Sequence, residues 1–593
     1  MRESAYPSVS SPSTPKLCLA AMAAGSAGLG LGPIRSGVDA PLSPVARLRR
    51  LAALEKGDVV VVVVYAIAIG LVSLAVPIAT QSLVNTVAFT ALVQPLVVLG
   101  VLVLAGLSAA GLLRALQYRV VETLQQRFFV RATHDSVGRL ARADVRAFAD
   151  RGAPELMNRF FEVALVQKAA STLLMDGLSV ALQAVVSLVL LAFYHPALLA
   201  FDVVLIVFIA FTLVVLGRGG VDTAIKESKA KYGTAAWLEE IAGSIRTFKA
   251  TGADEFAFTR ADALARAYVA ARGKHFKILF RQVVASYVLQ AVATAGLLGL
   301  GGFLVIKGEL TLGQLVAAEL IVTGVLAGVS KLGKYLESYY DLVASVDKVG
   351  AIVDLEDERH GGATWKPAEG PAHLRLDGVS FSYDGKTDAV SDVSLEVEAG
   401  ARLAILGSDA GGMSTLADLV YGLRTPARGQ VELDGIDLRT VPLGDLRSNV
   451  AFVGRAEVFD ASVLDNLCMG REHVDAAMVA EVLDAVALAK EVGELPEGTS
   501  TRLGHSGSRL TSSQASRLAI ARALLAEPRL LVIDEALDGL GAETAYEVLR
   551  GMASRGRSTT MIVFTSREEV ATAVGTVARL ERGRLRRSLE AAT

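Results

Sequence analysis

The sequence predicts a membrane all-α domain of six helices followed by an α/β P-loop nucleotide-binding domain. Three observations support this fold class. Long apolar segments are concentrated before about residue 345, and segments of that length are typical of helices that cross a bilayer. A glycine-rich loop at residues 407–415 has the spacing of a phosphate-binding loop. Short β-branched segments alternate with helical ones after residue 371, which is typical of α/β domains.

Length and charge limit the possible organisation and partners. A chain of 593 residues is too long for one compact core, so two or more domains are expected. The hydrophobic fraction of 52% and the mean hydropathy of +0.45 are high for a soluble protein of this size. The net charge of −2 gives no support for nucleic acid as a partner. Cys18 and Cys468 are too distant for a disulfide framework or a metal site, which favours a reducing environment for the polar half.

Six apolar spans define the predicted membrane domain. Positive residues precede the first span and fill the two long connections, whereas the loop at 81–93 carries no charge and the His195-Pro196 turn is minimal. Positive residues mark the cytoplasmic side, so both termini and both long connections are expected in the cytoplasm. The long connections are expected to continue the membrane helices. The spans are expected at roughly 58–80, 94–117, 173–194, 197–217, 283–306 and 312–332.

Two segments are expected to lack regular structure. Residues 1–45 are rich in Ser, Pro, Gly and Ala and are expected to form a disordered tail. A cleaved signal peptide is the alternative, because Arg2 and Lys16 precede a short apolar patch. Residues 351–371 turn polar and are punctuated by glycine and proline, which indicates a linker. The predicted domains are therefore a transmembrane domain at 46–350 and a nucleotide-binding domain at 372–593.

The loop at 407–415 carries the first chemical signal. Glycines that let backbone N–H groups curl around phosphates, and hydroxyl residues that hold Mg²⁺, stand in register. The lysine that such loops extend to the β- and γ-phosphates is replaced by Met413. The sequence therefore predicts a nucleotide cradle without its principal cation. The cradle residues are Gly407, Gly411, Gly412, Ser414 and Thr415.

An apolar strand that ends in two carboxylates is the second signal. Residues 530–533 are apolar and are followed by Asp534 and Glu535. Asp534 is expected to hold Mg²⁺ together with Ser414, and Glu535 is expected to polarise an attacking water. A buried strand that merely ends at a polar loop is the alternative for this hexamer taken alone. The phosphate loop upstream in the same domain argues against that alternative.

With both motifs placed, residues 45–585 resemble a bacterial ABC exporter half-transporter, in which one chain joins six membrane spans to a nucleotide-binding domain. Segments 495–498 and 516–525 are similar to the flanks of that family's signature sequence. The resemblance implies that Tyr383 stacks on adenine, with an ordinary strand aromatic as the alternative. It also implies ATP and Mg²⁺ as cofactors, and a multi-pass exporter domain surrounded by lipid in a bacterial cytoplasmic (inner) membrane.

The motifs that contact ATP in that family are altered in this chain. The signature L-S-G-G-Q reads L-T-S-S-Q here, so the side chains of Ser512 and Ser513 crowd an approach that glycine permits, while Thr511 and Gln514 keep their polar groups. Losing one charge-assisted contact costs about 1.5–3 kcal/mol, or roughly 10- to 150-fold in affinity. Weak ATP binding and poor or absent hydrolysis are therefore expected. The remaining altered positions are Gly454 or Arg455 for the Q-loop glutamine, Gly541 for the D-loop aspartate and Ser566 for the switch histidine.

Polar side chains inside the spans are candidates for a substrate cavity. Glu319 in the sixth span is the first candidate, with Gln290 and Gln314 as further polar groups at membrane depth. Interhelical hydrogen bonding or solvation at headgroup level is the alternative for Glu319. Asp176 and Asp202 are expected nearer an interface.

The sequence leaves three functions open. The first is a degenerate half-transporter that works in a dimer, because the resemblance implies that each ATP lies between one subunit's phosphate loop and the other's signature. Pairing with an intact relative then favours a heterodimer over a homodimer. The second is an active homodimeric ATP-driven exporter, and the third is a non-transporting membrane regulator or scaffold. Whether the chain is an enzyme stays open, and lipids, peptides and amphipathic drugs are all compatible substrates.

Overall fold

The computed structural model describes residues 42–87, 94–148, 153–359, 361–363, 365–408, 411–504, 507–555 and 559–587. The predicted tail at 1–45, with Cys18, lies almost entirely outside these ranges, as does part of the uncharged loop at 81–93. The chain divides into two compact units, Met1–Glu358 and Arg359–Thr593, each with its own apolar core.

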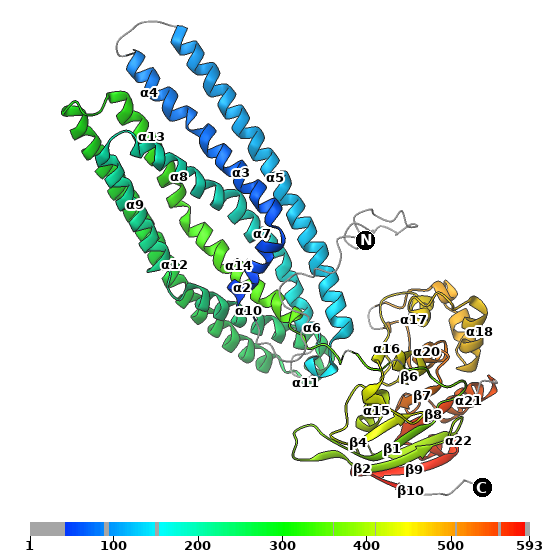
Figure 1. The fold of residues 1–593 in the computed structure, drawn as a ribbon. Helices are drawn as coiled ribbons and strands as arrows, with labels where there is room; N and C mark the ends of the chain where they lie inside the picture. The colour runs from blue at the N-terminus through cyan, green and yellow to red at the C-terminus, as the bar shows by residue number, and fades with distance from the viewer. Residues whose placement is uncertain are drawn as a thin grey trace. The chain divides into compact units, whose positions relative to one another are not determined.

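The first unit consists mainly of long helices (Figure 1). Helices α5 and α12 contain 49 and 53 residues, more than the ~20 that cross a bilayer, so the long connections continue the membrane helices as predicted. The helices are α2 (Pro44–Leu54), α3 (Lys56–Ser73), α4 (Ala75–Val87), α5 (Gln94–Arg142), α6 (Ala153–Asn158), α7 (Glu162–Thr172), α8 (Leu178–Ala192), α9 (Pro196–Val214), α10 (Gly220–Gly243), α11 (Ile245–Thr251), α12 (Asp254–Ile306), α13 (Leu312–Ser330) and α14 (Leu332–Val353).

The described residues contain six helical stretches that are long and apolar enough to cross a membrane, which confirms the predicted spans. Local signals fix where two of them begin. Pro196 is the first residue of α9, and the ring of His195 accepts a hydrogen bond from the Ala197 amide at 3.1 Å. Thr311 and Gln314 form a reciprocal capping box at the start of α13. The stretches are Lys56–Thr86, Leu96–Arg142, Leu156–Ala192, Pro196–Val214, Asp254–Ile306 and Leu312–Ser330.

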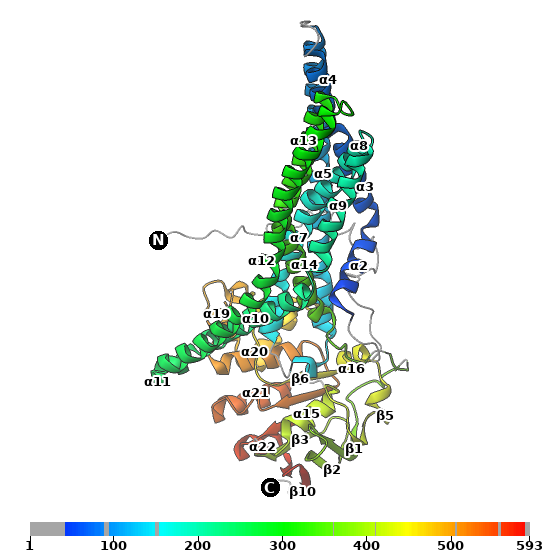
Figure 2. The same ribbon diagram turned by 90° about the vertical axis from the view of Figure 1, so that its left-hand side faces the viewer.

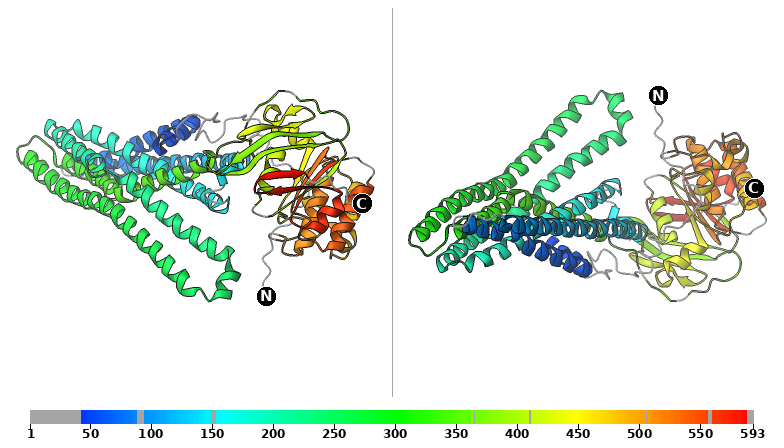
Figure 3. Two further views of the ribbon diagram at one scale, coloured as in Figure 1. Left: turned by 90° about the horizontal axis from the view of Figure 1, so that it is seen from below. Right: turned by 90° about the horizontal axis from the view of Figure 1, so that it is seen from above.

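Helix α10 and the N-terminal part of α12 form a hairpin that α11 joins at the tip. Within the first unit this hairpin diverges from α5 (Figure 3). At the tip, Trp237 is buried against Phe248, Phe256 and the guanidinium of Arg260. Phe258 beside them is 75% exposed. The hairpin thus has a core of its own and still presents apolar surface.

The second unit contains two sheets (Figure 2). The antiparallel sheet has the order β2-β1-β4-β5, with β1 (Leu374–Ser382), β2 (Asp388–Val397), β4 (Arg428–Leu433) and β5 (Ile436–Asp437). The other sheet has the order β10-β9-β3-β8-β7-β6, parallel except for β10, with β3 (Arg402–Gly407), β6 (Val450–Val453), β7 (Leu530–Asp534), β8 (Thr560–Thr565), β9 (Thr576–Glu581) and β10 (Arg584–Arg587). The helices are α15 (Met413–Tyr421), α16 (Leu443–Asn449), α17 (Val463–Cys468), α18 (Ala476–Ala485), α19 (Ala489–Gly493), α20 (Ser512–Leu524), α21 (Ala542–Ser554) and α22 (Glu568–Val574).

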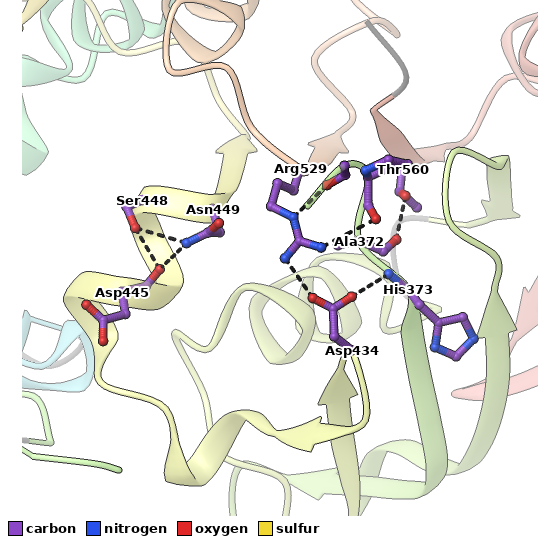
Figure 4. Close-up of polar contacts among 10 residues, drawn as sticks. Ala372, His373, Asp434, Asp445, Ser448, Asn449, Arg529 and Thr560 are labelled. Atoms are coloured by element: carbon purple, nitrogen blue, oxygen red, sulfur yellow. Dashed lines mark hydrogen bonds and ion pairs between the residues drawn. The ribbon is translucent and has the colours of Figure 1, made fainter. Parts of the chain in front are cut away.

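A polar anchor holds the segment that leads into β1 (Figure 4). Arg529, just before β7, donates to the carboxylate of Asp434 at 2.6 Å, and Asp434 also accepts from the His373 amide at 3.0 Å. The hydroxyl of Thr560, the first residue of β8, donates to the carbonyl of Ala372 at 2.5 Å. These bonds lie at the amino ends of β7 and β8, which leaves the carboxyl ends of the same strands free to carry a site.

Candidate functional site

Three neighbouring parallel strands end at one edge of the large sheet. In the order β3-β8-β7, their last residues are Gly407, Thr565 and Asp534. Ligands of such sheets bind at the carboxyl ends of the strands. The phosphate loop starts there and runs into α15. Its residues Asp409 and Ala410 lie outside the described residues.

Backbone geometry explains two glycines of the loop. Gly412 has a φ of +87°, and a Cβ at this position would lie 2.3 Å from the carbonyl oxygen of Ala389. A Cβ on Gly411 would lie 2.8 Å from the carbonyl oxygen of Ser408. Both distances are too short for real contacts, so only glycine permits this path. The loop therefore keeps the tight approach to the N-terminus of α15 that an anion requires.

Met413 is the first residue of α15 and is only 1% exposed. Its sulfur lies 2.9 Å from where a Cβ on Gly407 would stand, so the thioether folds back beneath the loop. It shares the core of the second unit with Leu416 and Phe564. A flexible thioether fills an irregular space of this kind without carrying charge. The structure thus buries an apolar side chain where loops of this spacing carry a cation.

Ser414 and Asp534 form the part of the site that fits Mg²⁺. The Ser414 hydroxyl hydrogen-bonds to the Asp534 carboxylate. The Oδ1 atom of Asp534 is buried and has no hydrogen-bond partner among the described residues. Burial raises the pKa of Asp534, and the charges of Asp418 and Asp538 raise it further against the Ser414 hydrogen bond. Because hard divalent cations prefer oxygen ligands, the donor set fits Mg²⁺.

Tyr383 follows β1 and lies over the start of α15. Its hydroxyl hydrogen-bonds with the hydroxyl of Thr415 at 3.0 Å. The guanidinium of Arg424 lies 4.7 Å from the ring centroid, and the ring of Phe381 meets it edge-on at 5.1 Å. The side chain is still 62% exposed. An exposed aromatic beside the phosphate loop suits a base, and its stacking role stays a prediction.

Glu535 follows β7 with a φ of +56°, in the left-handed region that residues with side chains seldom adopt. Its amide donates to the carbonyl of Phe564 at 2.9 Å, and its carbonyl accepts from the amide of Asp538 at 3.0 Å. These bonds hold the strained backbone in place. Strain of this kind is concentrated at functional sites, and the catalytic role of Glu535 stays a prediction.

Asp538 was not singled out by the sequence, yet it organises this edge of the sheet. Its carboxylate accepts hydrogen bonds from the Thr565 hydroxyl and from both the amide and the hydroxyl of Ser566, the latter two at 2.8 Å. Arg567 donates to the carbonyls of Asp538 and Leu540. At the position of the switch histidine, both polar hydrogens of Ser566 are therefore already donated to Asp538 of the same chain. The sequence shows only that another acid, Asp538, follows Asp534 by four residues. Nothing in the neighbouring residues indicates that this acid contacts Ser566.

The altered signature begins α20. Thr511 is its N-cap, and the Thr511 hydroxyl accepts from the Gln514 amide at 3.2 Å while the Gln514 side-chain oxygen accepts from the Thr511 amide at 2.8 Å. This capping box orders the helix start. Ser512 is exposed and Ser513 partly exposed, so their side chains stand at the helix N-terminus. Whether Thr511 and Gln514 bind a nucleotide stays a prediction.

A second polar contact extends from the signature. The side-chain Nε2 of Gln514 donates to the carboxylate of Glu491 at 2.6 Å, and the buried guanidinium of Arg517 pairs with the same carboxylate at 2.7 Å. Burial acts to raise the pKa of Glu491, but the hydrogen bonds from Arg517 and Gln514 outweigh it and lower that pKa overall. At the D-loop position, Gly541 is the N-cap of α21 and offers no side-chain cap.

The segment after β6 borders a cavity of about 340 Å³ within the second unit. Gly454 and Arg455, the positions assigned to the Q-loop, both line it. Arg447 and Arg471 line it too, and Tyr421 forms part of its wall stacked on a neighbouring aromatic ring. Arginine side chains therefore line the cavity. The family pattern places the neutral side chain of a glutamine at this position.

The candidates within the spans have different surroundings. Glu319 on α13 is partly exposed, and its Oε2 is buried without a hydrogen-bond partner among the described residues. Gln290 on α12 is partly exposed, whereas the Gln314 side chain is engaged in capping α13. The cavity role of all three stays a prediction. Asp202 is 3% exposed and enclosed by protein, and its expected place nearer an interface stays a prediction.

Two family models match the chain. The model of the ABC transporter transmembrane region matches residues 59–328, and the ABC transporter model matches residues 390–538. The chain is 32% identical over 297 residues to the ATP-dependent lipid A-core flippase of Chromobacterium violaceum, covering 50% of this chain and 51% of the flippase. It is 28% identical over 357 residues to the alpha-haemolysin translocation ATP-binding protein of Proteus vulgaris, covering 59% and 50% respectively. The matched part thus spans about half the length of these relatives.

The fold has a close counterpart among solved structures. A bacterial Atm1-family ABC exporter with ATP bound superposes with a TM-score of 0.80, at 22% identity, over 90% of this chain and 95% of the other. At 22% identity this superposition shows the fold alone, and the family models match its two domains. The chain therefore has the fold of an ABC exporter, in which a segment matched by the ABC transporter transmembrane region precedes one matched by the ABC transporter model.

Proposed function

We propose that this chain is one half of an ABC-type exporter, with a nucleotide-binding domain that binds ATP weakly and hydrolyses it poorly or not at all. The observation that carries the proposal is the burial of Met413 inside the phosphate loop. The loop, Ser414 and Asp534 are suited to hold a magnesium nucleotide, because glycine geometry and oxygen ligands are both retained. The Mg²⁺ so held would neutralise phosphate charge.

The missing cation is expected to weaken both binding and catalysis. One charge-assisted contact contributes about 1.5–3 kcal/mol, or roughly 10- to 150-fold in affinity. A cation at this position contributes more as phosphoryl charge develops. The Ser566 hydroxyl offers no replacement, because it already donates to Asp538. Tyr383, the loop amides and Ser414 remain as the groups that hold the nucleotide.

Assembly as a dimer is part of the proposal. The hairpin of α10 and α12 diverges from α5 (Figure 3), and its exposed tip residues Leu238, Phe256 and Phe258 are apolar. Exposed apolar surface of this kind marks contact sites. An intact half-transporter as partner would supply an unaltered phosphate loop opposite this chain's signature. That arrangement favours a heterodimer for a working transporter.

The remaining assignments concern location and cargo. Positive residues around the long connections favour a cytoplasmic location for both termini and for the nucleotide-binding domain, in a bacterial inner membrane. By their names, the relatives described above act as a lipid A-core flippase and in alpha-haemolysin translocation. An amphipathic lipid or peptide is therefore proposed as cargo, with Glu319, Gln290 and Gln314 as candidate contacts.

Reconstituted protein tests the proposal. Binding of a fluorescent ATP analogue and release of phosphate are measured on wild type and on Glu535→Gln. Weak saturable binding with negligible phosphate release supports the proposal. Brisk release that disappears in Glu535→Gln would instead establish an active homodimeric exporter. Absence of binding, together with no substrate flux beside an intact half-transporter, would establish a regulator or scaffold.

A further inference from the structure

Asp202 is a buried acid that nucleotide chemistry does not use. It lies within α9, about 9 Å along the helix axis from Pro196, and is 3% exposed. Neither of its carboxylate oxygens has a hydrogen-bond partner among the described residues. Leu198 and Leu205 lie one turn to either side on the same face, and both are buried. The carboxyl group therefore interrupts an apolar stripe.

The helices that pack on α9 bring no opposite charge to this group. The helices in most extensive contact with α9 are α8 and α12. α8 contains no titratable residue, and α12 beyond residue 281 contains one, Tyr287, which is 57% exposed. Arg281 donates to two backbone carbonyls beyond the end of α9. At the other end of α9, His195 is paired with Glu309 at 3.3 Å.

An ionised carboxylate in these surroundings is very unfavourable. Burial without a counter-charge or hydrogen bonds disfavours the charged form, and a carboxyl group in that situation binds a proton instead. A metal cation is a poor occupant, because Mg²⁺ and Ca²⁺ need six or so oxygen ligands, and the buried cluster that Leu198 and Leu205 join on α9 is apolar and includes Leu188, Leu191, Leu289 and Leu297. A proton needs one oxygen, which Asp202 supplies.

We infer that Asp202 is a proton-binding site of the transmembrane domain and carries its proton at neutral pH while α9 is packed against α8 and α12. Release of the proton places a charge within the leucine cluster, so release requires α9 to separate and admit water. Proton occupancy and the packing of α9 are therefore linked. The inference is independent of nucleotide binding and goes beyond the proposed function.

The link has a definite sign. An aspartate exposed in the opened state is ionised at neutral pH, because its ordinary pKa is about 3.9, whereas the inferred site holds its proton at neutral pH while α9 is packed. The packed state thus binds more protons than the opened state above that value, and its stability falls as pH rises until both states are ionised. Asp202→Asn removes this component of the pH dependence because the amide is neutral at every pH and nearly isosteric.

Infrared difference spectroscopy of the full chain in lipid nanodiscs at neutral pH tests the inference. Subtracting Asp202→Asn from wild type should leave the carbonyl stretch of one protonated carboxylic acid. Asp176→Asn is the matched control for the bands that the substitution itself introduces, because Asp176 is half-exposed and paired with Lys334 at 3.4 Å; its difference spectrum should lack the protonated-acid band. An ionised carboxylate signal in the Asp202→Asn difference would overturn the inference.

A second measurement needs no variant. Wild-type protein carrying aspartate labelled with a heavy carbon isotope at the carboxyl group should show an isotope-shifted protonated-acid band at neutral pH. That band should fade as the sample is made alkaline, while thermal stability decreases over the same range. Absence of any protonated aspartate at neutral pH would contradict the proposed site even if Asp202→Asn failed to fold.

Discussion

The carboxylate of Asp538 accepts hydrogen bonds from the backbone amide and from the hydroxyl of Ser566, each at 2.8 Å. Asp538 lies just after β7 and Ser566 just after β8, so this pairing joins the two strand ends that border the phosphate loop. The Thr565 hydroxyl adds a third donor to the same carboxylate. Residue 566 is thereby turned toward its own chain, and its hydroxyl and amide are both engaged by one carboxylate.

Restoring the cation of the phosphate loop should strengthen nucleotide binding. Met413→Lys is expected to raise the affinity for magnesium ATP roughly 10- to 150-fold, the range of one charge-assisted contact. Isothermal titration calorimetry on the purified chain measures the change. Met413→Leu keeps an apolar side chain of similar size and should leave the affinity unchanged. Equal affinities for Met413→Lys and Met413→Leu would show that the missing lysine is not what limits binding.

Removing the Asp538 carboxylate should destabilise the nucleotide-binding domain. Asp538→Ala leaves the donors of Thr565 and Ser566 without their charged acceptor, and one such bond contributes about 1.5–3 kcal/mol. Thermal unfolding followed through this domain should therefore begin at lower temperature. Asp484→Ala is the control, since Asp484 is exposed near the end of α18. A loss no greater than that of the control would mean that the Asp538 contacts contribute little.

Magnesium-dependent nucleotide binding should weaken in mildly acidic solution. Burial raises the pKa of Asp534 above its ordinary value, and the charges of Asp418 and Asp538 add to the rise. Protons then compete with Mg²⁺ for this carboxylate at a pH where an exposed aspartate is still ionised. Titrating ATP at fixed Mg²⁺ across this range measures the effect. Asp534→Asn should bind weakly at every pH, and an unchanged pH profile in that variant would assign the effect to another group.

The contact at the signature should make the domain sensitive to acid. Hydrogen bonds from Arg517 and Gln514 outweigh burial and lower the pKa of Glu491. A lowered acid pKa contributes stability above the unfolded pKa, and this contribution disappears as pH falls through the folded pKa. Glu491→Gln should therefore reduce the stability of the domain at neutral pH, and the variant should lose less stability than wild type as the pH falls. Thermal melting from neutral to acidic pH checks this, with Glu472→Gln at an exposed position as control. The same loss of stability with falling pH in Glu491→Gln and Glu472→Gln would refute this role of Glu491.

The sequence predicted those features that depend on local pattern. Six runs of apolar residues were enough to place the spans, and the apolar run before Asp534 was enough to place β7, because hydropathy and strand length are local properties. The spacing of the phosphate loop placed its glycines. The structure shows why Gly411 and Gly412 must be glycine, because a Cβ at either position would clash with a backbone carbonyl.

Features that depend on tertiary pairing could not be read from the sequence. Asp538 meets Ser566 only because β7 and β8 pair in a parallel register. Met413 is buried because its side chain packs against Gly407 and joins the core around Leu416 and Phe564, which its sequence position does not reveal. Asp202 is buried on the protein side of α9, and a lone acid in an apolar segment does not disclose which face of the helix it occupies; its expected place nearer an interface stays a prediction.

The central claim is that the phosphate loop built around Met413 holds ATP and scarcely cleaves it. The most direct test uses ATP labelled in its γ-phosphate, bound to wild-type protein with Mg²⁺ in a single-turnover experiment, with Glu535→Gln as the background. The label is expected to be recovered as intact ATP, with a release rate close to that background. Rapid appearance of free labelled phosphate from wild type, but not from Glu535→Gln, would contradict the account.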